Sequence, residues 1–199
     1  MHPHVYLISG APGAGKTTLG IALALQLGIT SLTVDDLVTA VQAVTTPETH
    51  PGLHLMWKTP HTEYFTESTV EKLVADAQNQ HRVVWPIVER VIRRHIRSGT
   101  SVVIDGWHIW PEFVTRLTVE GVSAAWIVVD LQVLEARERA NTGWLEGSAD
   151  PEKMLRNFLG RSLWFNQFFE TQAKAYGMKI LMQNGTKSVG ELINLILDE

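Results

Sequence analysis

Apolar runs and segments with helical spacing alternate along this chain. Short runs rich in β-branched residues are typical of strands buried in a parallel sheet, and they occupy residues 5–8, 29–34, 101–105, 124–129 and 179–182. The segments between them predict strand–helix–strand units. Because such units are right-handed and place helices on both faces of one sheet, we expect a three-layer α/β fold around a five-stranded parallel sheet.

Prolines and glycines limit the helices. We expect separate helices over 37–44, 63–78 and 86–97, with Pro86 in a first turn, where its missing N–H costs nothing. Residues 45–66 carry three prolines and a glycine, which predicts an irregular excursion of the kind that is usually functional. Residues 137–161 join two helices through a loop rich in helix breakers, which predicts a lid. No repeat divides the chain, so we expect a single domain over residues 1–199.

The most specific motif follows the first apolar run and precedes a helical segment. Gly10, Gly15, Lys16 and Thr17 fill the four fixed positions of the P-loop pattern G-x-x-x-x-G-K-[ST]. Glycines let backbone amides wrap phosphate oxygens, and the helix N-terminus adds its positive dipole end. We expect Lys16 on the β- and γ-phosphates and Thr17 on Mg²⁺. The predicted nucleotide-binding residues are Gly10, Ala11, Pro12, Gly13, Ala14, Gly15, Lys16, Thr17 and Thr18.

Acidic residues follow two of the predicted strands at the sheet edge where ligands bind. Asp105 is expected to hold Mg²⁺ with Thr17, with a turn-capping role as the alternative. Phosphoryl transfer also needs a carboxylate that takes the proton of the acceptor hydroxyl. We predict Asp35 as this base. Asp36 is predicted to be the N-cap of a helix that begins near Leu37 and to lie on the acceptor side of the site. The reverse assignment, and capping roles for both, stay open.

Arginines stand at both edges of the predicted lid, where guanidinium groups neutralise charge that develops during transfer. We assign Arg137 and Arg156 to catalysis and Arg161 to the acceptor; a solvated helix face is the alternative, since several glutamates lie nearby. The acceptor pocket is predicted to include His54, Trp107 and His108, with ordinary packing as the competing interpretation. Their spacing resembles no zinc motif.

Charge and cysteine usage exclude several classes of protein. The net charge is −4 over 199 residues without a block of like charges, which argues against a sequence-independent nucleic-acid or membrane-surface binder. Cysteine is absent, so neither a disulfide framework nor a thiolate metal site is available. With no leader-like or membrane-spanning run, we expect a cytoplasmic protein whose partner is a small molecule; the oligomeric state stays open.

The order of these signals resembles the P-loop kinases of small molecules and nucleotides. Asp105-Gly106-Trp107 looks like the Asp-Gly-aromatic step of nucleoside monophosphate kinases, and Asn184-Gly185-Thr186 is similar to the turn that cradles their base. Within this group the chain resembles the 2-phosphoglycerate kinase-like proteins in four stretches: 35–37, 51–54, 102–111 and 155–161.

The resemblance implies a sheet order of 2-3-1-4-5 and ATP with Mg²⁺ as phosphoryl donor. It also implies that Asn184 and Gly185 contact the base of the nucleotide. The same resemblance implies that His54, His108 and the lid arginines lie near the acceptor. The chain departs from the family at Val38 and Gln42, where arginine is usual. Loss of two cations weakens binding of a phosphorylated acceptor, so a less charged acceptor fits as well.

Together these signals predict an ATP-dependent kinase that transfers the γ-phosphoryl group to a hydroxyl of a small metabolite. Two other classes remain: a nucleotide-dependent ATPase or switch acting with a protein or RNA partner, and a P-loop module without catalysis.

Overall fold

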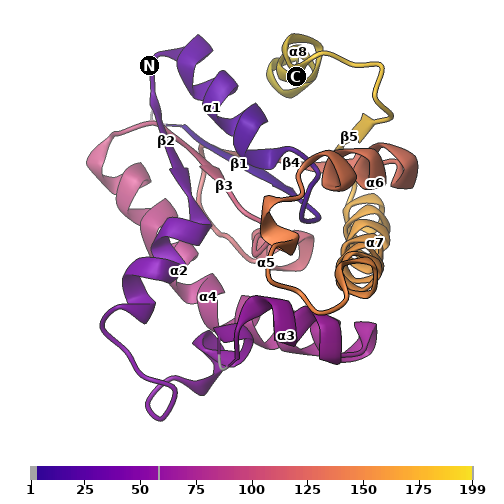
Figure 1. The fold of residues 1–199 in the computed structure, drawn as a ribbon. Helices are drawn as coiled ribbons and strands as arrows, with labels where there is room; N and C mark the ends of the chain where they lie inside the picture. Colours follow the sequence, from indigo (N-terminus) through magenta and orange to yellow (C-terminus); the bar gives the residue numbers. More distant parts are fainter. Residues whose placement is uncertain (1–3, 58, 199) are drawn as a thin grey trace.

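The computed structural model describes residues 4–57 and 59–198, with a parallel sheet at its centre (Figure 1). The strand order is β2-β3-β1-β4-β5, as the resemblance implied. The strands are β1 (Val5–Gly10), β2 (Thr30–Thr33), β3 (Val102–Asp105), β4 (Val122–Val129) and β5 (Lys179–Gln183).

Helices cover both faces of this sheet, which confirms the three-layer α/β fold (Figure 1). On one face lie α1 (Lys16–Leu27) and α8 (Val189–Leu197), whose apolar side chains form one core with the sheet. The opposite face carries α2 (Val34–Gln42), α4 (Val70–Ser98), α5 (Pro111–Thr115) and α7 (Pro151–Ala175) over a second core. No helix within residues 4–57 and 59–198 is long and apolar enough to cross a bilayer.

Helix α4 corrects two boundary predictions. Pro86 lies inside this single 29-residue helix and does not start a new one. Pro86 has no N–H to donate to the carbonyl of Arg82. Both residues are exposed, so this carbonyl can bond to water, while Val84 and Val88 stay buried in the core. The expected helix over 63–78 is interrupted at Thr69, whose side chain accepts a 3.3 Å hydrogen bond from the backbone N–H of Lys72 and caps α4.

The start of α2 corrects another prediction. The helix begins at Val34, three residues before the expected start, and its N-cap is Thr33, whose hydroxyl accepts from the backbone N–H of Asp35. Asp36 is therefore not the N-cap. Asp35 and Asp36 both lie in the first turn, where carboxylates interact favourably with the helix dipole.

The predicted excursion, 45–66, forms two short 3-10 turns, η1 (Pro51–Leu53) and η2 (Leu55–Trp57), followed by α3 (His61–Glu67). Residue 58 of this stretch lies outside the described residues. The predicted lid, 137–161, contains the end of α6 (Leu131–Ala140), the turn η3 (Gly143–Leu145) and the start of α7.

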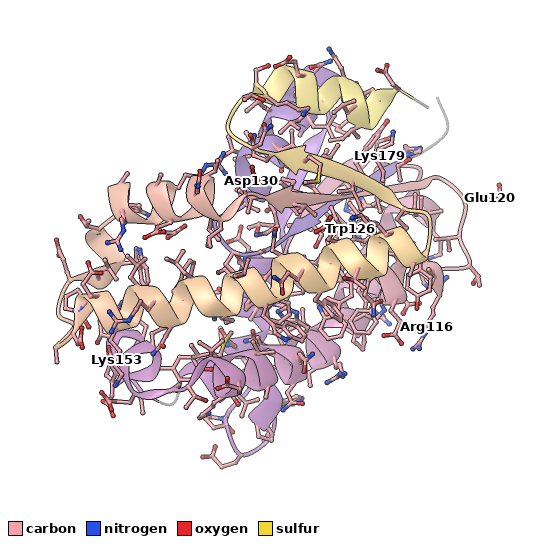
Figure 2. All side chains as sticks on the ribbon, turned by 90° about the vertical axis from the view of Figure 1, so that its right-hand side faces the viewer. Arg116, Glu120, Trp126, Asp130, Lys153 and Lys179 are labelled. Carbon is pink, nitrogen blue, oxygen red and sulfur yellow. The ribbon has the colours of Figure 1, made fainter. Side chains whose placement is uncertain are left out.

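Helix α7 is fixed to the sheet near its middle. Asn166 exchanges two hydrogen bonds with the backbone of Val129, accepting from its N–H at 2.9 Å and donating to its carbonyl at 3.0 Å. Trp126 is fully buried between β4 and α7 (Figure 2). The lid half of α7 therefore extends from a rigid anchor toward the carboxyl end of the sheet.

Candidate active site

The P-loop turns from β1 into α1 through three glycines with positive φ. Gly13 and Gly15 have φ values of +78° and +94°, and a Cβ on Gly10 would lie 2.6 Å from the carbonyl oxygen of Ile127. Lys16 folds back over the loop and donates a 2.9 Å hydrogen bond to the carbonyl of Ala11. The loop thus has the close-packed backbone that the motif predicts.

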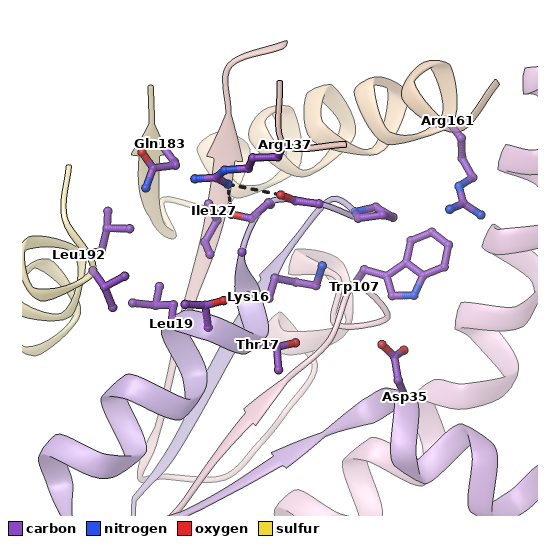
Figure 3. Close-up of a pocket in the computed structure, with 16 residues that line it drawn as sticks. Lys16, Thr17, Leu19, Asp35, Trp107, Ile127, Arg137, Arg161, Gln183 and Leu192 are labelled. Carbon is purple, nitrogen blue, oxygen red and sulfur yellow. Dashed lines mark hydrogen bonds between the residues drawn. The ribbon is translucent and has the colours of Figure 1, made fainter. Parts of the chain in front are cut away.

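A cavity of about 660 Å³ opens along this loop, and we name it the P-loop cavity (Figure 3). The predicted residues Pro12 to Thr18 line it, whereas Gly10 and Ala11 are buried and contribute no lining. In the view of Figure 3, Gln183 and Leu192 lie on one side of Lys16, and Trp107, Asp35 and Arg161 lie on the other. The cavity therefore has two chemically different ends.

Thr17 and Asp105 lie together beside the loop, because the β1–β3 pairing places Asp105 opposite Ile8. The Thr17 hydroxyl donates a 2.8 Å hydrogen bond to Oδ1 of Asp105. The other carboxylate oxygen, Oδ2, is buried with no hydrogen-bond partner among the described residues. Burial raises the pKa of Asp105, and the Thr17 hydrogen bond and Lys16 oppose that shift. A buried carboxylate with a vacant oxygen beside a threonine hydroxyl fits a hydrated Mg²⁺ ion.

No cluster of three histidine, aspartate or glutamate side chains suited to a metal occurs in the described part of the chain.

Lys16 lies between the acids of the site. Burial lowers the pKa of Lys16 to about 8, against the opposing charges of Asp35 and Asp105. A phosphate placed on the loop would raise the pKa of Lys16 again, because a nearby anion favours the protonated amine.

The far end of the P-loop cavity is lined by Gln183, Val189 and Leu192 from β5 and α8. The predicted base-binding residues Asn184 and Gly185 lie next to this lining without being part of it. Asn184 Oδ1 accepts from the backbone N–H and hydroxyl of Thr186, and the Gly185 N–H donates to Oε1 of Gln183. The turn therefore orients Gln183, which sequence reasoning missed although it ends the fifth strand.

A second cavity of about 520 Å³, which we name the aromatic cavity, adjoins the first. Its walls include Tyr64 and Phe65 from α3, Trp144 from η3 and Phe158 from α7. Asp35, Trp107 and Arg161 line both cavities. Asp35 thus stands where a phosphate on the loop and a molecule in the aromatic cavity would meet. Desolvation by the walls of the cleft raises the pKa of Asp35, Lys16 opposes the rise, and the charge of Asp36 adds to it.

His108 faces Asp35 from the loop after β3. Its Nδ1 is 3.9 Å from Oδ1 of Asp35 and has no hydrogen-bond partner in the described structure. The ring is 2% exposed, and burial lowers the pKa of His108 to about 3, so it is neutral at physiological pH. His108 lines the aromatic cavity, and its acceptor-side role stays a prediction.

The lid arginines have different surroundings. Arg137 donates to the P-loop carbonyls of Gly13 and Ala14 at 3.4 and 3.3 Å (dashed lines, Figure 3). Arg161 is 4% exposed and lines both cavities. Arg156 is exposed on α7 outside the lining of either cavity, so its predicted catalytic role stays a prediction without support from these contacts. Arg139 pairs with Glu135 and Glu152 on the surface, as the alternative interpretation proposed.

Two predicted acceptor-side residues lie outside both cavity linings. His54 Nε2 is hydrogen-bonded to the Thr45 hydroxyl at 3.0 Å, and Asp36 points away on the exposed face of α2. Val38 and Gln42, the two positions where the chain departs from the resembled family, both line the aromatic cavity.

The lid is docked onto α3 above the aromatic cavity. The His61 ring is 2.9 Å from the carbonyl of Trp144, and Asn157 donates to the carbonyls of Phe65 and Ser68. Glu138, 9% exposed, is held by α6 beside Gly13 and lines the aromatic cavity. The sequence carries no functional signal for Glu138, which is one of the glutamates near the lid arginines, or for Trp144, because neither stands in a motif.

This fold and this loop define the P-loop kinase class. The family model described as isopentenyl transferase matches residues 3–110, more than half of the chain, and the chain belongs to that family. The 2-phosphoglycerate kinase of Pyrococcus furiosus is 32% identical over 185 residues, which are 90% of this chain and 59% of that protein. The chain thus spans about three fifths of the length of this curated relative.

Solved structures of similar fold include a shikimate kinase from Bacteroides thetaiotaomicron, with a TM-score of 0.51 at 18% identity, covering 98% of this chain and 94% of that one. A gluconokinase from Sinorhizobium meliloti has a TM-score of 0.55 at 16% identity, covering 98% and 90% of the two chains. At these identities the likeness shows the fold.

Proposed function

We propose that this chain is an ATP-dependent kinase that transfers the γ-phosphoryl group to a hydroxyl of a small molecule. The observation that carries the proposal is the position of Asp35, which lines both the P-loop cavity and the adjoining aromatic cavity. A carboxylate at this junction is within reach of a hydroxyl held in the aromatic cavity beside a phosphate held on the loop. The similarity to a 2-phosphoglycerate kinase supports the same class of reaction.

In the proposed mechanism Asp35 takes the proton of the acceptor hydroxyl as the acceptor oxygen bonds to the γ-phosphorus. The bond from that phosphorus to the β–γ bridging oxygen breaks, and ADP leaves. Lys16 and Arg137 neutralise negative charge on the phosphates, and the P-loop amides hold them in line. Thr17 and Asp105 would hold Mg²⁺, which neutralises phosphate charge when bound.

Trp107 and the docked lid contribute by excluding water. Trp107 is 8% exposed at the junction, and Trp144 and Phe158 close the aromatic cavity from the lid side. The Asp35 side chain is 68% exposed, so a bound acceptor has to cover it. Because water competes with the acceptor hydroxyl for the phosphoryl group, that covering favours transfer over hydrolysis.

The test is ADP release by the purified chain with Mg²⁺ and ATP, measured against a panel of sugars, hydroxy acids, phosphoglycerates, nucleosides and nucleoside monophosphates. We expect at least one acceptor to raise the rate well above the background, and Lys16→Met to remove the increase. A chain that binds ATP but responds only to a protein or RNA would be a partner-dependent ATPase instead. Consumption of an isopentenyl donor in place of ATP would also contradict the proposal.

A further inference from the structure

We infer that the acceptor is an unphosphorylated hydroxy acid with a single carboxylate and a ring-sized apolar body, and that Arg161 binds the carboxylate. This inference rests on the proposed kinase function and names its substrate class.

The first observation is that Arg161 is a buried cation without an anionic partner. Its guanidinium is surrounded by three rings, 4.7 Å from the centroid of Phe65, 4.8 Å from that of Trp107 and 5.4 Å from that of Phe158. Within the described structure no carboxylate pairs with it, its Nε has no hydrogen-bond partner, and its one polar contact is the sulfur of Met56 at 4.0 Å. A buried, unpaired guanidinium that lines a cavity is ready to bind a planar anion through two parallel hydrogen bonds.

The second observation is the position of Arg161 relative to the P-loop. In the view of Figure 3, Trp107 lies between Lys16 and Arg161, while Arg137 is bonded to the loop itself. The two arginines thus serve different ends of the site. Arg137 lies on the P-loop, and Arg161 lies where the P-loop cavity and the aromatic cavity meet.

The third observation is the charge of the aromatic cavity. Arg161 is the one lysine or arginine among the described residues that line it, and it is accompanied by the carboxylates of Asp35 and Glu138. Gln42 stands at one of the positions where the resembled family carries arginine. Its side-chain amide donates a 2.7 Å hydrogen bond to the carbonyl of Leu53. Because the two carboxylates outnumber the one cation, this lining repels an acceptor that carries both a phosphate and a carboxylate more strongly than one with a single carboxylate that pairs directly with Arg161.

The fourth observation is the size and lining of the cavity. A cavity of about 520 Å³, with five aromatic rings among its lining residues, is far larger than a three-carbon acid fills. An apolar ring-sized body stacks on Trp144 and Phe158, and its carboxylate then reaches Arg161 while a hydroxyl points at Asp35.

The experiment compares hydroxylated ring monocarboxylates, among them shikimate and mandelate, with their primary amides and with glycerate and 2-phosphoglycerate. Two readouts are used: ADP release, and calorimetric binding in the presence of Mg²⁺ and a non-hydrolysable ATP analogue. We expect a ring monocarboxylate to bind about 10- to 100-fold more tightly than its amide, the difference that a charge-assisted bond makes. Arg161→Gln removes that preference, Arg161→Lys keeps part of it, and affinity for the ATP analogue changes less than the preference for acid over amide.

Lys174→Gln is the matched control, since it removes one positive charge from the exposed, distant end of the same helix. A gain-of-function variant is independent of Arg161: Thr39→Arg adds a cation at an exposed position that lines the aromatic cavity, and it should improve the use of 2-phosphoglycerate.

Each contrary result has a distinct meaning. Equal binding of acid and amide, or a preference of the unmodified chain for 2-phosphoglycerate, overturns the inference and leaves the kinase function standing. A chain that binds the ATP analogue but releases no ADP with any acceptor overturns both.

Discussion

The hydroxyl of Thr17 donates a 2.8 Å hydrogen bond to Oδ1 of Asp105, which joins the first turn of α1 to the end of β3. Gly20 makes this approach possible, because a Cβ at that position would lie 3.3 Å from Cβ of Asp105. The pair leaves Oδ2 of Asp105 buried without a hydrogen-bond partner in the described structure.

Asp105→Asn should separate nucleotide binding from stability. The folded pKa of Asp105 lies above its unfolded value, so the ionised carboxyl costs stability above both values, and that cost disappears as the pH falls below the unfolded value. Asparagine keeps an acceptor for Thr17 without the charge. At pH 7 we expect a Tm at least equal to that of the unmodified chain, but a smaller rise of Tm with Mg²⁺ and ATP.

The matched control is Asp130→Asn, which changes an exposed acid at the carboxyl end of β4 (Figure 2) outside both cavity linings. A large loss of Tm in Asp105→Asn, with an unchanged response to Mg²⁺ and ATP, would give Asp105 a structural role only.

Asp35→Asn should lower kcat by a factor of about 10² to 10⁴, the usual contribution of a general base, with little change in ATP affinity. The acidic limb of the pH–rate profile should disappear too, since protonation of Asp35, whose pKa is raised, removes the base. Steady-state kinetics over a range of pH measures both effects. Asp36→Asn is the informative comparison: a larger loss there than in Asp35→Asn would assign the base to Asp36.

Lys16 should take up a proton when a triphosphate binds at alkaline pH. With a pKa of about 8, Lys16 loses its charge as the pH of the nucleotide-free chain rises through that value. Bound phosphates favour the charged amine, so above pH 8 binding draws a proton from the buffer. Calorimetry at pH 8.5 in buffers of different ionisation enthalpy measures the uptake, which Lys16→Met should abolish. Identical enthalpies in all buffers would contradict the prediction.

Gly13→Ala should loosen the contact between the P-loop and α6. At φ +78° a new Cβ would lie 2.4 Å from Cδ1 of Leu134 and 2.6 Å from Oε1 of Glu138. We expect a loss of about 1–3 kcal/mol in the free energy of unfolding, measured by urea denaturation, with weaker ATP binding. Gly143→Ala, where a Cβ would meet nothing within 4 Å, should change neither quantity by much. Equal effects of the two variants would disprove the steric argument.

The fold and the phosphate end of the site could be predicted because their signals are local. The P-loop is a continuous motif, and the apolar strands end on the acids that the parallel sheet gathers at one edge. Thr17 follows from the motif, and Asp35 and Asp105 follow from the ends of the strands. The strand order came from the resemblance, since periodicity alone does not order parallel strands.

The rest depends on packing between segments distant in sequence. Pro86 is tolerated inside α4 because it lies on the exposed face of that helix. The sequence around Pro86 does not show which face of the helix is exposed and which is buried. Arg156 and Arg161 stand five residues apart on α7, yet only Arg161 lies against Phe65 and Trp107. The role of Trp144 likewise depends on how η3 docks onto α3.

The most direct test of the proposed function follows the phosphoryl group itself. The chain is incubated with Mg²⁺, the acceptor that gives the highest ADP release, and ATP labelled with ¹⁸O in its γ-phosphoryl group, and the acceptor is analysed by mass spectrometry. We predict an acceptor that has gained the labelled phosphoryl group on a hydroxyl, and almost none of this product with Asp35→Asn. Label found only in inorganic phosphate would contradict the assignment of the chain as a small-molecule kinase.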